Sequence, residues 1–206
     1  MPARLFVLAG VNGAGKSSIG GAAIQASGAE FFNPDIAAAR LREQQPQLSA
    51  EQVNGLAWTL GRQGLEKALA ESLTYAFETT LGGNSIVKLL LDGARAGAEV
   101  HLWYAGLATP ELHLRRIKAR VAAGGHDIPE AKVRERFDAS RSNLVKLMPH
   151  LASLRLYDNS FEADPRAGRR PQPVLLLQML RGRVIAHAPL RSVPAWAKPL
   201  LAVALR

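Results

Sequence analysis

The chain has 206 residues, of which 48% are hydrophobic, which suits one globular domain and excludes a disordered class. It contains no cysteine, which excludes disulfide bonds, zinc–thiolate sites and thiol nucleophiles. The net charge of +9 favours anionic partners, and we expect a small anionic substrate rather than nucleic acid because no aromatic-rich stacking surface is evident.

A glycine-rich segment follows a short apolar strand predicted at residues 5–9 and leads into a helix predicted at 16–26. Its residues are Gly10-Val11-Asn12-Gly13-Ala14-Gly15-Lys16-Ser17, the full G-x-x-x-x-G-K-[ST] pattern in the strand-to-helix context that it requires. This pattern predicts that ATP phosphates bind at Gly10, Asn12, Gly13, Ala14, Gly15, Lys16, Ser17 and Ser18. The Lys16 side chain would contact the β- and γ-phosphates, and the Ser17 hydroxyl would ligate Mg²⁺.

Strands and helices alternate through most of the remaining chain. We predict further strands at residues 30–32, 73–77, 99–105 and 154–158. We predict helices at 34–41, 49–69, 85–96, 109–124 and 129–147. A loop at 162–173, a hairpin formed by 174–180 and 184–188, and a helix at 194–205 complete the chain.

This alternation predicts an α/β fold, a P-loop NTPase three-layer α/β/α sandwich with a mostly parallel central sheet. We expect a single domain over residues 1–206, with a helical lid at about 109–148 and a small C-terminal appendage, the hairpin and helix, at about 165–206. Ligands of such sheets bind outside the carboxyl ends of the strands, so polar residues that follow strands are the candidates for the site.

Asp35 leaves the second predicted strand at this rim and is the candidate general base for a kinase. The alternative is that Asp35 only interacts with the dipole of its own helix. Glu78, Thr79 and Thr80 follow the third strand, where they could bind substrate hydroxyls, although either threonine could instead cap the following loop.

Basic residues concentrate in the predicted lid, where arginines could stabilise charge on the transferred phosphoryl group. They are Arg115, Arg116, Lys118, Arg120, Arg134, Arg136 and Arg141, with His126 in the loop between the helices. We expect a minority of them to contact substrate. The fourth strand ends without an aspartate, so Asp35, or Asp158 in reserve, would support the Mg²⁺ shell.

Several motifs together resemble the zeta-toxin family of small P-loop kinases. Besides the P-loop they are Phe32-Asn33-Pro34-Asp35, Phe77-Glu78-Thr79-Thr80, Tyr104-Ala105-Gly106-Leu107, Pro110-Glu111-Leu112, the segment from Arg120 to Pro129 that contains Gly124-Gly125-His126, and Ser140 to Leu144. They occur in the family's order over roughly residues 4–160.

The resemblance implies ATP- and Mg²⁺-dependent phosphorylation of a sugar hydroxyl, with UDP-N-acetylglucosamine as the acceptor in the toxins. It implies that Lys16 is the P-loop lysine, Asp35 the base and Glu78 a substrate contact. Arg120 matches the first catalytic arginine of the family, and Arg134 or Arg136 the second. His126 lies where the toxins carry an arginine. The resemblance also implies an antitoxin protein as a partner.

Two other functions compete with the sugar-hydroxyl kinase. One is a nucleic-acid- or nucleoside-directed P-loop kinase, and the other is a nucleotide-hydrolysing switch, although no N-K-x-D or D-x-x-G pattern is present. No apolar run approaches the ~18 residues needed to span a bilayer, and the N-terminus runs directly into the first strand. We therefore expect a cytoplasmic protein with no membrane partner.

Overall fold

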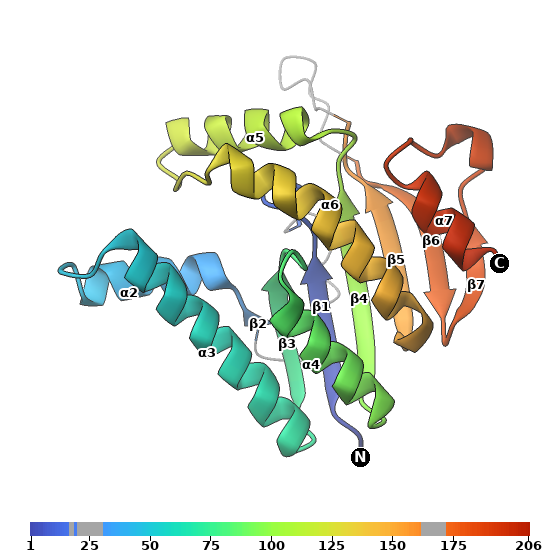
Figure 1. Ribbon diagram of the computed structural model, residues 1–206, viewed down its shortest axis with the longest axis horizontal. Helices are drawn as coiled ribbons and strands as arrows, with labels where there is room; N and C mark the ends of the chain where they lie inside the picture. Colours follow the sequence, from blue (N-terminus) through green and yellow to red (C-terminus); the bar gives the residue numbers. More distant parts are fainter. Residues whose placement is uncertain (17–18, 20–30, 162–171) are drawn as a thin grey trace.

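A computed structural model describes residues 1–16, 19, 31–161 and 172–206 (Figure 1). Its centre is a seven-stranded sheet in the order β2-β3-β1-β4-β5-β6-β7. The strands are β1 Arg4–Ala9, β2 Phe31–Phe32, β3 Thr74–Thr79, β4 Glu99–Gly106, β5 Ser153–Asp158, β6 Val174–Leu180 and β7 Arg183–His187. Strands β1 to β5 are parallel, and β6 and β7 join antiparallel. The predicted mostly parallel α/β architecture and the terminal hairpin are confirmed.

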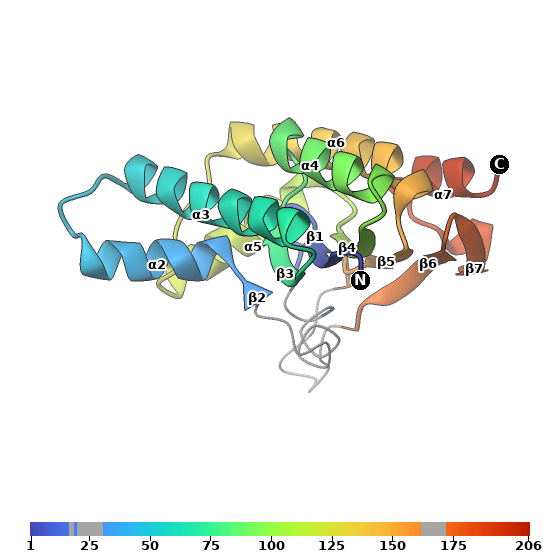
Figure 2. The same ribbon diagram turned by 90° about the horizontal axis from the view of Figure 1, so that it is seen from below.

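The helices are α2 Pro34–Gln44, α3 Ala50–Ala70, α4 Asn84–Arg95, α5 Pro110–Ala122, α6 Glu130–Leu147 and α7 Lys198–Ala204. Helices α3, α4, α6 and α7 lie along the same side of the sheet (Figure 2). Most of the helix predicted at 16–26, and Glu30 of the strand predicted at 30–32, lie outside the described residues. Within the part of the chain that the structure describes, no helix has the length and hydropathy needed to cross a bilayer.

Side-chain hydrogen bonds cap α2 and α3 at the N-termini that the sequence predicts. Asn33 Oδ1 accepts from the backbone N–H of Asp35 and Ile36, which satisfies orphan donors at the start of α2. Ser49 and Gln52 form the predicted capping box of α3. Side-chain caps therefore determine where α2 and α3 begin.

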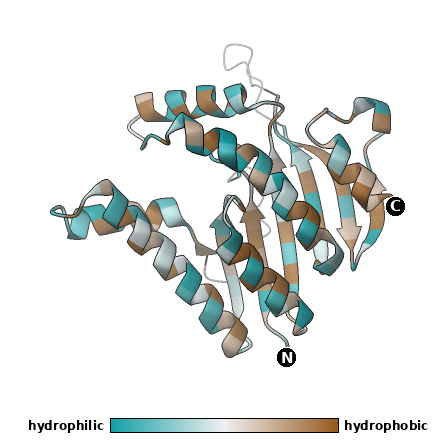
Figure 3. Ribbon diagram, in the orientation of Figure 1, coloured by the Kyte–Doolittle hydropathy of each residue, from teal (hydrophilic) through white to brown (hydrophobic). Residues whose placement is uncertain are grey.

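The core lies on both faces of β1. Leu5 and Val7 pack toward the layer that contains Leu65 of α3 and Leu144 of α6, and all are fully buried. Phe6 and Leu8 face the other way and pack with Trp103. β1 is accordingly an almost uninterrupted apolar strand, as expected of a parallel strand covered on both sides, and Figure 3 shows it as hydrophobic along its length.

The C-terminal helix is shorter than predicted. The sequence predicts a helix over 194–205, whereas α7 begins at Lys198 and residues before it form a turn. Pro199 explains the difference, because proline is tolerated only in the first turn, and in a helix interior its ring would clash with an earlier carbonyl. Trp196 in this turn packs over Gly106, where a Cβ would lie 2.1 Å from the indole ring.

Candidate active site

The P-loop turns sharply between the end of β1 and Lys16. Gly10, Gly13 and Gly15 adopt positive φ angles of 140°, 81° and 74°, which side-chain-bearing residues rarely adopt. At Gly10 the space is restricted too, because a Cβ would lie 2.3 Å from the carbonyl oxygen of Ala105 at the end of β4. The motif therefore has glycine at these positions because the turn requires positive φ angles and, at Gly10, the absence of a side chain.

Lys16 is buried beneath the loop and has a carboxylate partner. Its Nζ donates to the Gly10 carbonyl at 2.8 Å and lies 3.1 Å from Glu78 Oε1, with 6% of the Lys16 side chain and 14% of the Glu78 side chain exposed. A buried ammonium needs such a partner because desolvating an isolated charge is costly. Glu78 is therefore the counter-charge of the P-loop lysine in this conformation.

Asn33 connects this ion pair to the start of α2. Its Nδ2 donates to Glu78 Oε2 at 3.1 Å, while its Oδ1 caps the helix. The Asn33 amide thus donates to the end of β3 and accepts from the first turn of α2, and so connects two parts of one rim. Asp35 follows directly and is held at that rim.

Asp35 contacts α5 and the loop between α5 and α6, the two helices that the sequence predicts to form a lid. Arg120 Nη1 lies 3.4 Å from Asp35 Oδ2, and His126 Nε2 lies 3.6 Å from Asp35 Oδ1. Arg120 also donates from Nη2 to the His126 carbonyl at 3.1 Å, which holds the loop between the lid helices against the arginine. Residues far apart in the sequence therefore meet around one carboxylate.

A cavity of about 440 Å³ brings most of the predicted site together. Its lining includes Asn12, Lys16, Asp35, Glu78, Thr79, Thr80, His126 and Arg136. The Thr79 and Thr80 hydroxyls also accept from the backbone N–H of Leu81 and Gly82, so both threonines hold the following turn as well as lining the cavity.

Asn12 in the P-loop is held by both lid helices. His113 Nδ1 of α5 lies 2.8 Å from the Asn12 carbonyl, and Arg136 Nη1 of α6 donates to Asn12 Oδ1 at 2.8 Å. Burial lowers the pKa of His113 to about 4, so the ring is neutral and its Nδ1–H donates to the carbonyl. Burial also lowers the pKa of Arg136, against the opposing effect of Glu135 and Asp35.

Other predicted residues lie away from the cavity. Arg134 is exposed and pairs with Glu111 at 2.7 Å and Glu130 at 2.8 Å, and its hydrogen bond to Glu111 is the main cause of its raised pKa. Asp158 Oδ1 accepts from Ser160 Oγ at 2.5 Å and Trp196 Nε1 at 3.1 Å. Ser17 and Ser18 lie outside the described residues.

Two further residues contact the P-loop. Besides His113, the buried Asn159 donates from Nδ2 to the Ala14 carbonyl at 2.8 Å, and its own carbonyl accepts from Arg116. Asn159 follows the end of β5, so its place after a parallel strand was a usable signal. His113 lies inside a helix and had no such signal.

Comparison with known proteins agrees with this geometry. Residues 5–147 match the AAA_33 family, described as an AAA domain. The chain belongs to this family. A relative in Haemophilus influenzae (strain ATCC 51907 / DSM 11121 / KW20 / Rd), an uncharacterized protein, is 33% identical over 140 residues, which cover 66% of this chain and 94% of the relative.

Solved structures share the P-loop kinase-like fold at low sequence identity. A chain in the complex of AvrRxo1-ORF1 and -ORF2 with ATP superposes with a TM-score of 0.66 at 18% identity over 98% of this chain, which spans 64% of that chain's length. A chain of the PezAT chromosomal toxin–antitoxin system of Streptococcus pneumoniae gives a TM-score of 0.54 at 17% identity, covering 77% of this chain and 68% of that chain. These similarities establish the fold.

Replacement of Glu78 tests its role as the counter-charge of Lys16. In Glu78→Gln the buried ammonium loses its partner, so we expect the free energy of unfolding to fall by about 3 kcal/mol without ligand. MgATP should then raise the melting temperature more in the variant than in the wild type, because the triphosphate supplies negative charge. Differential scanning calorimetry with and without MgATP measures both effects.

Glu135→Gln is the matched control for that change, since Glu135 lines the same cavity but is 61% exposed and pairs with Lys132. We expect its unfolding free energy to stay within about 0.5 kcal/mol of the wild type. Equal melting temperatures of Glu78→Gln and Glu135→Gln would contradict the assigned role.

His113 predicts a specific loss of stability in acid. Its pKa is about 4 in the folded protein and 6.5 when exposed, so between these values the unfolded chain binds a proton that the folded chain does not. The contribution of the neutral His113 ring to the free energy of unfolding is therefore fully present above pH 6.5, and it is lost as the pH falls towards 4. His113→Asn keeps a donor for the Asn12 carbonyl but cannot titrate.

Urea unfolding of both proteins at pH 7 and pH 4 measures this difference. The wild type should lose about 2–3 kcal/mol more than His113→Asn over this interval. Parallel losses in the two proteins would show that His113 does not bind the extra proton on unfolding.

Proposed function

We propose that this protein is an ATP- and Mg²⁺-dependent kinase that transfers the γ-phosphate to a hydroxyl of a nucleotide-sugar resembling UDP-N-acetylglucosamine. The observation that supports this proposal is the cavity that Lys16, Asp35 and Glu78 line together. A lysine that could bind phosphate and two carboxyl groups that could engage a hydroxyl line one cavity, as transfer between two bound substrates requires.

The residues of the P-loop fit a triphosphate. Successive glycines with positive φ give a backbone turn of the kind that directs N–H groups at an anion, and Lys16 adds a positive charge beside it. Mg²⁺ would be held by the Ser17 hydroxyl and the phosphates themselves, and would neutralise charge on the phosphate oxygens. The structural similarity to a complex that contains ATP supports the same nucleotide.

At the acceptor end, Asp35 takes the proton. The acceptor hydroxyl oxygen forms a bond to the γ-phosphorus, the bond to the β-phosphate oxygen breaks, and the hydroxyl proton passes to the Asp35 carboxylate. Glu78, Thr79 and Thr80 line the same cavity and would bind neighbouring hydroxyls. Arg120 and His126 hold Asp35 from the lid side.

Arg136 is the second catalytic arginine in this proposal. It lines the cavity beside the P-loop, where a partly desolvated guanidinium interacts strongly with phosphoryl charge. Arg134 is paired with Glu111 and Glu130 on the exposed side of α6 and does not line the cavity.

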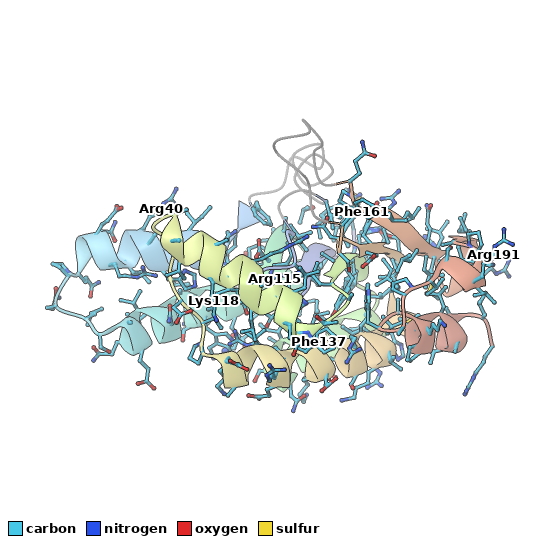
Figure 4. The ribbon with its side chains drawn as sticks, turned by 90° about the horizontal axis from the view of Figure 1, so that it is seen from above. Arg40, Arg115, Lys118, Phe137, Phe161 and Arg191 are labelled. Carbon is cyan, nitrogen blue, oxygen red and sulfur yellow. The ribbon has the colours of Figure 1, made fainter. Side chains whose placement is uncertain are left out.

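The basic surface fits an anionic substrate. Arg40 of α2 and Arg115 and Lys118 of α5 are exposed and do not line the cavity (Figure 4). Such charges raise the rate at which anions reach a site without contacting them in the complex.

The similarity to chains of a toxin–antitoxin system and of a two-protein complex supports a further proposal, that an antitoxin-like protein binds this chain.

Replacement of the base tests the reaction. In Asp35→Asn we expect phosphate transfer to UDP-N-acetylglucosamine to fall by about 10²- to 10⁴-fold, because the amide cannot take the proton, while MgATP affinity stays within a few-fold. The measurement is acceptor-dependent ADP formation across UDP-sugars, nucleosides and oligonucleotides, with calorimetric titration of MgATP.

Asp138→Asn is the control, since Asp138 is exposed and pairs with Arg141 on α6 outside the cavity. It should keep wild-type turnover. Unchanged turnover in Asp35→Asn would remove Asp35 from the chemistry, and ADP formation that no acceptor stimulates would favour a hydrolysing switch instead.

The two candidate arginines can be compared on one helix. Arg136→Ala should lower kcat by about 10³-fold or more, as loss of a charge-stabilising arginine does, whereas Arg134→Ala should stay near the wild type because it loses only exposed ion pairs. Steady-state kinetics of both variants, with their melting temperatures, measure this. A larger loss of kcat in Arg134→Ala would reverse the assignment.

A further inference from the structure

Helix α3 presents polar and aromatic side chains to the cavity at helical spacing. Asn54, Trp58 and Arg62 lie four residues apart and all line the cavity. Val53, one position before Asn54, is fully buried, packs with Ala38 of α2 and does not line the cavity. The helix therefore uses one stripe for packing and a neighbouring stripe as a cavity wall.

Trp58 is the most unusual residue of this wall. Its side chain is 47% exposed although indole is among the largest apolar groups, so its apolar surface remains partly in water unless something covers it. An exposed aromatic inside a cavity, rather than on an outer face, is available to a ligand ring.

Arg62 is aligned with this ring along the helix. Its guanidinium carbon lies 5.6 Å from the Trp58 ring centroid, and Nη1 lies 3.0 Å from Glu66 Oε1. Both charged side chains of that pair are 39% exposed, so the pair contributes little and can exchange for an anionic ligand. Arg62 Nε is buried and has no hydrogen-bond partner among the described residues, so the guanidinium has unused donor capacity.

Close packing holds this wall in place. A Cβ at Gly61 would lie 2.6 Å from Phe32 Cε1, so glycine lets α3 approach the end of β2. Phe32 also lines the cavity. The wall thus rests against the sheet through a contact that no larger residue would permit.

The cavity is chemically asymmetric. Asp35 and Glu78 are carboxylates, which suit hydroxyl groups, whereas the α3 wall offers an aromatic face, a guanidinium and an amide. We propose that Trp58, Arg62 and Asn54 form a subsite for the nucleobase and adjoining phosphate of the acceptor, whose reacting hydroxyl lies at Asp35. This inference rests on the proposed kinase function and assigns the residues that select its acceptor.

A planar base fits this wall better than a sugar ring. A base stacks face-on against indole, its edge carries donors and acceptors for the Asn54 amide, and the phosphate beside it forms charge-assisted hydrogen bonds with Arg62. A neutral sugar has no anionic group for the guanidinium. The reacting hydroxyl then extends towards Asp35.

Direct binding without turnover tests the subsite. The P-loop is first saturated with Mg²⁺ and a non-hydrolysable ATP analogue, and UDP, GDP, uridine and N-acetylglucosamine are then titrated calorimetrically. We expect a nucleoside diphosphate to bind, uridine to bind more weakly, and N-acetylglucosamine not to bind measurably. Trp58→Leu should weaken diphosphate binding by about 5- to 150-fold, and Trp58→Phe by less because a stacking ring remains.

Arg62→Gln should reduce the preference for UDP over uridine, since it removes the phosphate partner. Leu60→Ala is the matched control, because Leu60 lies on the same helix with the same 47% exposure but does not line the cavity, and it should bind as the wild type does. Unchanged diphosphate binding in Trp58→Leu, failure of UDP and GDP to bind, or Trp58-dependent binding of N-acetylglucosamine would each overturn the inference.

The two proposals fail in distinguishable ways. A bound nucleotide-sugar that is never phosphorylated leaves the subsite intact and removes the kinase function. Phosphate transfer that is indifferent to Trp58 leaves the kinase function and removes the subsite.

Discussion

The buried ion pair between Lys16 and Glu78 is the constraint on which the rim depends. A lysine under the P-loop has so little contact with water that a carboxylate must lie beside it, and the order of the sheet meets this need by placing β3 next to β1. Asn33 then orients the same carboxylate and begins α2. The need for a counter-charge beside Lys16 thus also positions Asp35, because Asn33 contacts Glu78 and caps the helix turn that carries Asp35.

The segment predicted to form a lid contacts two groups that line the cavity. His113 and Arg136 hold Asn12 of the P-loop, while Arg120 and His126 hold Asp35. A movement of α5 and α6 would alter the loop and the proposed base together. This coupling suits a reaction in which water must be kept from a phosphoryl group until the acceptor is bound.

The two walls of the cavity have different origins. The P-loop wall belongs to the glycine-rich motif, which lies within the family match over residues 5–147, and its glycines are required by the backbone geometry. The α3 wall follows from packing, because Gly61 lets the helix approach Phe32 and leaves Trp58 and Arg62 at the cavity. The proposed nucleotide site and the proposed acceptor subsite therefore depend on different structural constraints.

The sequence by itself determined the P-loop, the alternation of strands and helices, the helix caps and the polar residues at strand ends, because these depend on local backbone geometry and short-range periodicity. It left open which of Arg134 and Arg136 reaches the cavity, and it did not reveal His113 or the wall around Trp58. Only the tertiary structure decided these, since helix rotation and long-range packing, with Asn12 and His113 101 residues apart, determine which side chains meet.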